Sequence, residues 1–264
     1  MRKLRESMTL FESDPRYREK ATIWRLFSLL PLFGALADGH VWRWFAINIP
    51  MDLGTGGAFT SDIDIMARLH DFPRSQEWLY RTWEVKVSLI HKDGAAKSLK
   101  LGKLKRTTTQ LNAYRAFGSP DTSLLDVYLC EAGFFGRHPS PPEALSNSIS
   151  CKAAALRGQG FGYQALPFEH GRDADGDVGL TAVSSVANPL RTTLDIVPPV
   201  VDAPRQPFLR LADHLHEFFE QCEGRPRKHF HQIVFCRECR RLQLISMKDQ
   251  HNCLGCGADL IMQS

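Results

Sequence analysis

The sequence reads Thr60-Ser61-Asp62-Ile63-Asp64-Ile65 at its most informative point and, a short interval later, Glu84-Val85-Lys86-Val87. Polar and apolar residues alternate in both stretches, and successive side chains of a β-strand point to opposite faces of the sheet. Each stretch therefore predicts a strand with charged groups on one face and apolar side chains on the other. If the two strands pair in a suitable register, the carboxylates converge with the Lys86 ammonium.

Such a cluster suits the hydrolysis of phosphodiester bonds. Mg²⁺ prefers carboxylate oxygens as ligands and retains several of its waters, one of which can attack phosphorus. Lys86 would hold or deprotonate the attacking water, or offset charge in the transition state. The plainer alternative is that Glu84 and Lys86 form an exposed strand edge and that the two aspartates close a turn.

Further periodic segments surround these strands and predict an α/β fold, with a central mixed sheet flanked by helices. Helical spacing of apolar residues, with Gly118 as a stop signal for one helix, separates the helices from the short β-branched and aromatic strands. The expected helices are 16–38, 104–117, 143–157 and 208–222, and the expected strands are 41–49, 61–67, 82–90, 124–130, 163–168 and, less distinctly, 180–186.

This order of elements, with the acids and the lysine on neighbouring strands, resembles the core of the PD-(D/E)xK nuclease superfamily, the restriction-endonuclease-like fold. The resemblance covers residues 16–168. It implies that Asp64 is the catalytic aspartate, that Glu84 and Lys86 form the Glu-x-Lys pair, and that Gln110 is the glutamine found on the following helix in many members. The chain departs from the family signature because no proline precedes the aspartate.

The same resemblance implies a catalytic Mg²⁺ or Mn²⁺ held by Asp64 and Glu84. Asp62, and Glu19 on the first expected helix, are weaker candidates for further metal ligands. The substrate implied is nucleic acid, DNA ahead of RNA, and the implied setting is restriction, repair or anti-phage defence.

A basic connector leads from the second of these strands into helix 104–117. Between Val85 and Gly118 there are eight lysines and arginines and a single acid. Cations beside a phosphoesterase cluster would neutralise backbone phosphates without reading the base sequence. The candidate nucleic-acid-binding residues are Lys97, Lys100, Lys103, Lys105 and Arg106. A solvated loop is the alternative for any one of them.

Four cysteines near the C-terminus form two Cys-x-x-Cys pairs, Cys236 with Cys239 and Cys253 with Cys256. Four thiolates at this spacing are typical of a closed, structural Zn²⁺ site. Apolar segments at 233–235, 242–245 and 260–262 would supply the strands of a zinc ribbon. The basic residues around the ribbon leave two uses open, gripping nucleic acid or docking a partner protein.

The whole chain has 264 residues, 43% of them hydrophobic, and a net charge of +4. We interpret 1–206 as the nuclease-like core, 207–228 as an amphipathic helix with a basic linker, and 229–264 as a zinc ribbon with its own core. No apolar run is long enough for a transmembrane helix, so no membrane partner is expected. Cysteines in a metal pattern favour a reducing compartment, and hence the cytoplasm.

The sequence thus predicts a metal-dependent nuclease. The competing hypothesis is a catalytically inactive nucleic-acid-binding or scaffold protein that uses the nuclease-like core and the ribbon to assemble a larger complex.

Overall fold

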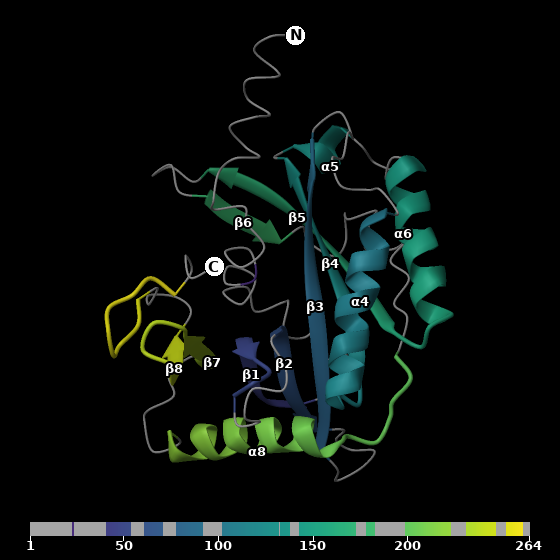
Figure 1. Cartoon of the computed structure of the whole chain (residues 1–264). Helices are drawn as coiled ribbons and strands as arrows, with labels where there is room; N and C mark the ends of the chain where they lie inside the picture. Colours follow the sequence, from purple (N-terminus) through teal and green to yellow (C-terminus); the bar gives the residue numbers. More distant parts are fainter. Residues whose placement is uncertain are drawn as a thin grey trace.

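Figure 1 shows the computed structural model of the chain, in which an eight-stranded mixed sheet forms the centre. The strand order is β6-β5-β4-β3-β2-β1-β7-β8. The structure describes residues 23, 41–53, 61–70, 78–91, 102–131, 133–137, 143–172, 178–182, 199–222, 231–246 and 252–260. These residues confirm the predicted α/β class.

The strands are β1 Val41–Pro50, β2 Asp62–His70, β3 Trp78–Ile90, β4 Thr122–Glu131, β5 Gly162–Arg172, β6 Val178–Ala182, β7 His231–Cys236 and β8 Arg241–Ser246. The helices are α4 Gly102–Phe117, α5 Phe134–Arg137, α6 Glu143–Arg157 and α8 Gln206–Gln221. Every expected element after residue 40 and before residue 246 has its counterpart here. Expected helix 16–38 lies outside the described residues, apart from Ile23, which is helical and buried.

The sheet is mixed because hairpins and crossovers alternate along the chain. Strands β1, β2 and β3 form an antiparallel meander. Strands β3, β4 and β5 are parallel, and α4 and α6 provide the connections that parallel pairing requires. The parallel strands are buried on both faces, as the nearly continuous burial of β4 illustrates.

Three helices cover one face of the sheet. In Figure 1, α4 and α6 lie on the same side of the sheet, and α8 crosses its lower end beneath β1, β2 and β3. Leu111 of α4 and Ile149 of α6 share one buried cluster with β4 and β5. Phe117 of α4 shares a second cluster with the apolar stripe of α8, which includes Phe208 and Leu215. The amphipathic segment is therefore part of the core.

Gly118 ends α4 and is required there by geometry. Its φ is +105°, in the region that favours glycine, and its N–H is 3.0 Å from the Arg115 carbonyl oxygen. A Cβ on Gly118 would lie 2.6 Å from the Cβ of Arg205, immediately before α8. This glycine therefore both stops one helix and lets the next approach.

The C-terminal segment does not have the separate core that we expected for the ribbon. Strand β7 pairs in parallel with β1 through Ala46 and Ile233, so β7 and β8 extend the main sheet. Val234, Cys253 and Leu260 belong to the same buried cluster as residues of β1, β2 and β3. The cysteine segment is thus part of the main sheet and its core, and not a separate unit joined by a linker.

Two smaller points complete the fold. The prediction of a third ribbon strand at 260–262 is wrong for Leu260, which lies in a turn after the isolated bridge between Asn252 and Asp259. The other two residues of that segment lie outside the described ranges. Among the helices that the structure describes, none has the length and apolarity needed to cross a membrane.

Candidate active site and metal centre

The two strands with the charged residues separate from each other at a fork. Their ladder runs from His70 and Trp78 to Ile65 and Trp83. Beyond that pair, β2 remains beside β1 alone, and β3 continues beside β4. Asp64 and Glu84 follow the last pair in register, so they occupy opposing positions on the same face where the strands part.

The fork brings together Asp64, Glu84 and Lys86. A carboxylate oxygen of Asp64 (Oδ2) accepts the backbone N–H of Val85 at 2.8 Å. The Lys86 ammonium donates to Glu84 Oε1 at 2.5 Å and to the Val85 carbonyl at 3.0 Å. The Glu84 side chain is only 2% exposed and that of Lys86 is 25% exposed. The glutamate is therefore fixed inside the protein, while the lysine reaches the surface.

Tyr114 of α4 ties the two branches of the fork together, a role that the sequence did not suggest. Its hydroxyl accepts the N–H of Asp64 at 3.2 Å. It lies 2.7 Å from Glu84 Oε2 and 3.0 Å from the Asp62 carbonyl, either of which can accept its proton. Burial, followed by the charges of Asp64 and Glu84, raises the tyrosine pKa well above its ordinary value, so the hydroxyl keeps its proton.

Asn48 lies opposite Asp64 on β1 and has an unusual backbone conformation. Its φ is 52°, in the left-handed region that asparagine tolerates better than most residues. β1 stays paired with β2 on either side of Asn48, but its apolar side chains enter different clusters, because Ile47 belongs to one buried cluster and Ile49 to the other. The alternation that predicted these strands is therefore interrupted beside Asp64.

Gln110 and Asp62 have different surroundings. Gln110 is one helical turn before Tyr114, and its Oε1 is buried without a hydrogen-bond partner among the described residues. Asp62 forms an ion pair with Arg237, which lies between the first two cysteines. Glu19 lies outside the described residues.

Only part of the basic connector can be located. Lys105 and Arg106 are exposed near the start of α4. Lys97 and Lys100 lie outside the described residues, and so does the side chain of Lys103. The helix that leads to Tyr114 therefore begins with exposed cations.

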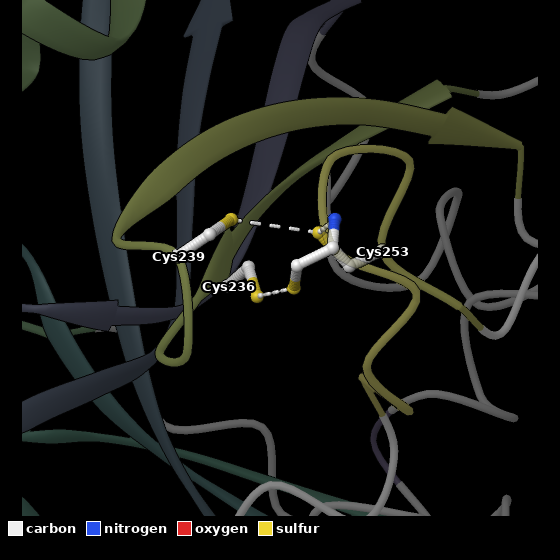
Figure 2. Close-up of side chains that lie close together, drawn as sticks. Cys236, Cys239 and Cys253 are labelled. Carbon is white, nitrogen blue, oxygen red and sulfur yellow. Dashed lines mark hydrogen bonds between the residues drawn. The ribbon is translucent and has the colours of Figure 1, made fainter.

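The four cysteines form one compact group with their sulfur atoms facing one another, as Figure 2 shows. The sulfur atoms of Cys236 and Cys256 are 3.7 Å apart, and those of Cys239 and Cys253 are 3.6 Å apart. A tetrahedral ion with bonds of about 2.3 Å to sulfur needs ligands separated by about 3.8 Å. The cysteines are therefore positioned to hold a metal ion, and within the described ranges no second group of three His, Cys, Asp or Glu ligands lies as close.

Backbone and side-chain amides favour negative charge on the sulfur of Cys253, whereas burial and hydrogen bonds to the neighbouring thiols raise the pKa of Cys239 to about 12. Burial raises the pKa of the Cys253 thiol, but N–H groups of Cys256 and Gly255 lower it by more in combination with the neighbouring thiols, to about 6. Gln243 of β8 donates from Nε2 to the same sulfur at 2.9 Å and accepts the Leu254 N–H at 2.7 Å. No motif links this buried glutamine to the cysteines, so it could not be identified from the sequence.

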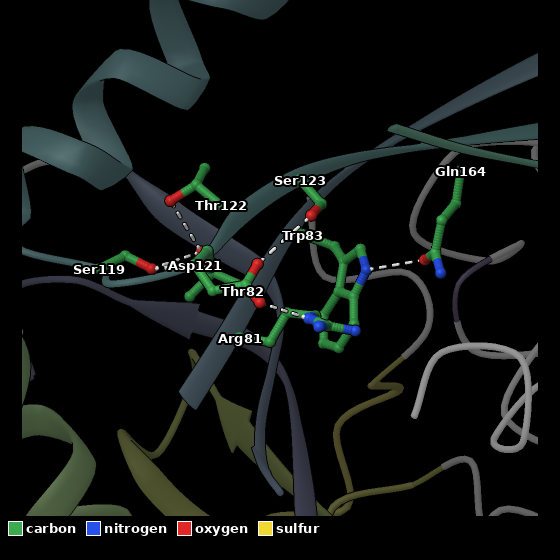
Figure 3. Close-up of polar contacts among 8 residues, drawn as sticks. All are labelled: Arg81, Thr82, Trp83, Ser119, Asp121, Thr122, Ser123 and Gln164. Atoms are coloured by element: carbon green, nitrogen blue, oxygen red, sulfur yellow. Dashed lines mark hydrogen bonds and ion pairs between the residues drawn. The ribbon is translucent and has the colours of Figure 1, made fainter. Parts of the chain in front are cut away.

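A separate polar network involves residues 81–83 of β3, directly before Glu84 (Figure 3). Arg81 donates to the Asp121 carboxylate at 2.6 Å, and the two side chains are 12% and 8% exposed. Thr82 bonds Ser119 at 2.8 Å, and the Trp83 ring N–H donates to Gln164 at 3.1 Å. These contacts join β3, β4 and β5 where β4 begins, beside the position of Glu84.

A second buried ion pair lies under α6, and the sequence analysis missed it. Lys152 donates to the Asp126 carboxylate at 2.6 Å. The same carboxylate oxygen accepts the hydroxyls of Tyr128 and Tyr163 at 3.1 and 3.0 Å. Three donors satisfy this aspartate, and the ion pair ties α6 to the parallel strands.

Comparisons of the chain with protein-family models, with curated proteins and with solved structures gave no match. The candidate site must therefore be judged on its own geometry.

Proposed function

We propose that this protein is a metal-dependent nuclease that hydrolyses phosphodiester bonds, with DNA as the preferred substrate. One observation carries the proposal: the fork gathers Asp64, Glu84 and Lys86 on one face of the sheet, around the hydroxyl of Tyr114. Two carboxylates and an ammonium at one point are the groups that metal-assisted phosphodiester hydrolysis requires.

The oxygen atoms at the fork fit a hard divalent cation. Lys86 already sits between Glu84 Oε1 and the Val85 carbonyl oxygen, so this pair of oxygens accommodates a positive charge. Together with the carboxylate of Asp64 they would hold Mg²⁺ or Mn²⁺, which would polarise the phosphoryl group and supply a bound water. The Lys86 ammonium would then turn toward that water.

The remaining groups have roles that follow from their positions. Lys86 would orient the attacking water or offset charge on the phosphoryl oxygens, since its side chain reaches the surface. The unpartnered Oε1 of Gln110 is an acceptor that a water at the site could satisfy. Tyr114 holds the two carboxylates in place and remains protonated.

We place the chain with the restriction-endonuclease-like folds and the PD-(D/E)xK nucleases on the same grounds. An antiparallel meander followed by a parallel crossover through α4 sets Asp64 on β2 and the Glu84-x-Lys86 pair on β3. We further propose that the cysteine group holds a structural Zn²⁺, because four sulfur ligands close the site to substrate.

A non-catalytic nucleic-acid-binding or scaffold role is the second candidate, and one observation favours it. Both carboxylate oxygens of Glu84 are already engaged, one by Lys86 and the other by Tyr114. A glutamate satisfied in this way needs no metal, and the ion pair could serve stability alone.

Cleavage assays with single-stranded and duplex DNA and RNA, with Mg²⁺ or Mn²⁺ and with neither, separate the two candidates. The informative variants are Asp64→Asn, Glu84→Gln and Lys86→Met, which nearly preserve side-chain size. Each should reduce cleavage by about 10³-fold, because each removes an acid, base or electrostatic group of the reaction. Titration with Mn²⁺ should show weakened metal binding in the first two variants and retained binding in the third.

Asp121→Asn is the matched control. It removes a nearly buried carboxylate that pairs with Arg81, which lies three residues before Glu84 on the same strand. It should lower thermal stability and leave the cleavage rate of the folded protein unchanged. Wild-type cleavage by the Lys86→Met variant would refute the proposed mechanism, and intact substrate with wild-type protein under every condition would favour the scaffold.

A further inference from the structure

The first cysteine pair lies next to the fork, although the two are far apart in sequence. Strand β7 runs parallel to β1, with Ile47 and Val234 in register. The end of β7 therefore emerges beside the end of β1, where Pro50 pairs with Asp62 at the start of β2. The turn between Cys236 and Cys239 therefore lies near the start of β2, two residues before Asp64.

Arg237, in that turn, contacts the acidic side of the fork. Its guanidinium pairs with the Asp62 carboxylate. The carbonyl of the same aspartate lies 3.0 Å from the hydroxyl of Tyr114, which in turn lies 2.7 Å from Glu84. One residue therefore separates the guanidinium from the group that orders the candidate catalytic glutamate.

The ion pair is accessible to a ligand. The side chains of Arg237 and Asp62 are 38% and 25% exposed. An exposed ion pair adds little to stability, so it exchanges readily for another anion. A guanidinium presents a planar fork of donors that matches phosphate oxygens in two hydrogen bonds.

We propose that Arg237 binds a backbone phosphate of the nucleic acid, exchanging the Asp62 carboxylate for the phosphate when substrate arrives. The inference rests on the proposed nuclease function and assigns the cysteine turn a part in it: the metal-held turn positions a phosphate-binding arginine beside the catalytic groups. Asp62 is then a competitor for the guanidinium and not a ligand of the catalytic metal.

The exchange predicts that substitutions of Arg237 and of Asp62 change the affinity for nucleic acid in opposite directions. Binding is measured by fluorescence anisotropy with short labelled single-stranded and duplex DNA and RNA, in Ca²⁺ to prevent turnover. Arg237→Ala should weaken binding about 10-fold and reduce the salt slope by about 0.9 on duplex DNA, the amount expected for one lost phosphate contact. The affinity of Arg237→Lys should lie between those of wild type and Arg237→Ala, because lysine keeps the charge and loses the planar set of donors.

Asp62→Asn should bind more tightly than wild type, by about 3-fold or more, because the guanidinium loses its competing anion. Arg241→Ala is the matched control, since Arg241 is exposed at the start of β8 and no Asp62 contact involves it. It should bind within about 2-fold of wild type. The metal-to-protein ratio and the melting temperature of each variant show whether the cysteine turn is intact.

The outcomes separate this inference from the proposed function. Equal affinity of wild type and Arg237→Ala, together with normal cleavage, overturns the inference and leaves the nuclease standing. Weaker binding by Asp62→Asn also overturns it, because the aspartate would then assist the ligand. If wild-type protein binds none of the oligonucleotides, both proposals fall. Should Arg237→Ala lose its metal, Arg237→Lys and Asp62→Asn still decide the question.

Discussion

The cysteine cluster draws its ligands from a short piece of chain, whereas the fork draws its groups from three distant elements. Cys236 and Cys256, the outermost ligands, are 20 positions apart. At the fork, Tyr114 contacts the backbone of Asp64 from 50 positions away and Glu84 from 30. The first site is encoded by local spacing, and the second depends on strand register and on the packing of a helix.

This difference decides what each site reveals about function. Four thiols within 4.8 Å of one another have a clear chemical use, because a metal ion satisfies them together. The groups at the fork can satisfy one another, as Lys86 and Glu84 do. Geometry alone therefore supports metal binding more directly at the cysteines than at the acids.

The two regions nevertheless depend on each other. The cysteine segment continues the main sheet through β7, and Cys253 belongs to the cluster that underlies β2 and β3. Arg237 links the cysteine turn to Asp62. Loss of a ligand from the cysteine cluster should therefore also destabilise the fork.

The largest effect tests this dependence. Cys253→Ser should abolish metal binding and destabilise the whole protein, since loss of a metal ligand in a shared core costs about 4 kcal/mol or more and lowers the melting temperature by roughly 10 °C. Calorimetry should show a single transition at the lower temperature, and elemental analysis should show the loss of zinc.

Cys151→Ser is the control, because Cys151 is an exposed free thiol on α6. It should keep both the metal and the melting temperature. A Cys253→Ser protein in which the C-terminal segment melts separately, with the remaining transition unchanged, would mean that the ribbon is an independent unit after all.

Much of the fold could be predicted because its signals are local. Residues 82–89 of the strand that carries Glu84 and Lys86 alternate between polar and apolar, and α4 ends at Gly118, which has a positive φ. The face shared by Asp64 and Glu84 followed from the same alternation once the strands paired. These features need no information about distant parts of the chain.

Other parts of the site depend on contacts that no local pattern contains. Tyr114 was one aromatic residue on an expected helix, and only the packing of α4 brings its hydroxyl to Glu84. Arg237 reaches Asp62 because β7 joins the sheet next to β1, whereas the sequence suggested a ribbon apart from the core. Asn48 interrupts its strand although both of its neighbours in the sequence are isoleucines.

A smaller effect should follow from removing the hydroxyl that joins the fork. Tyr114→Phe leaves the Asp64 N–H and one Glu84 oxygen without their partner, which should cost about 2 kcal/mol and lower the melting temperature by roughly 4–8 °C. The metal content of the cysteine cluster should not change. Tyr80→Phe on β3 is the control, since no hydrogen bond to its hydroxyl is found at the fork.

The pH dependence of that difference gives a second readout. The pKa of Tyr114 is raised well above its ordinary value of 10.0 by burial and by the neighbouring carboxylates. A raised folded-state pKa stabilises the fold fully below the unfolded value, and this stability disappears as the pH rises through the folded value. The stability gap between wild type and Tyr114→Phe should therefore be constant up to about pH 10 and shrink above it. A gap that widens between neutral pH and pH 9 would mean that the hydroxyl ionises at the fork, because the unfolded state would then bind more protons than the folded state.

The smallest expected effect on the melting temperature concerns the residues with positive φ in the two regions. The described residues contain two non-glycine residues with positive φ, and each region has one: Asn48 opposite Asp64, with φ 52°, and Arg240 directly after Cys239, with φ 53°. Asparagine tolerates this conformation, whereas arginine pays roughly 1–2 kcal/mol for it. Arg240 is also 70% exposed, so its long ion pair with Asp52 and its contact with the ring of Phe235 stabilise the turn only weakly.

Glycine substitution should therefore have opposite consequences at the two positions. Arg240→Gly relieves more strain than the entropy of a glycine costs, and should raise the melting temperature by about 2 °C. Asn48→Gly should lower it by a similar amount, about 2 °C, because Asn48 is buried and its side chain fills space beside the fork. Calorimetry of the two variants, each with its metal content verified, measures both signs. Equal stabilisation would mean that the asparagine is strained and that its side chain does nothing for the fork, whereas a loss at Arg240 would mean that the arginine itself holds the cysteine turn.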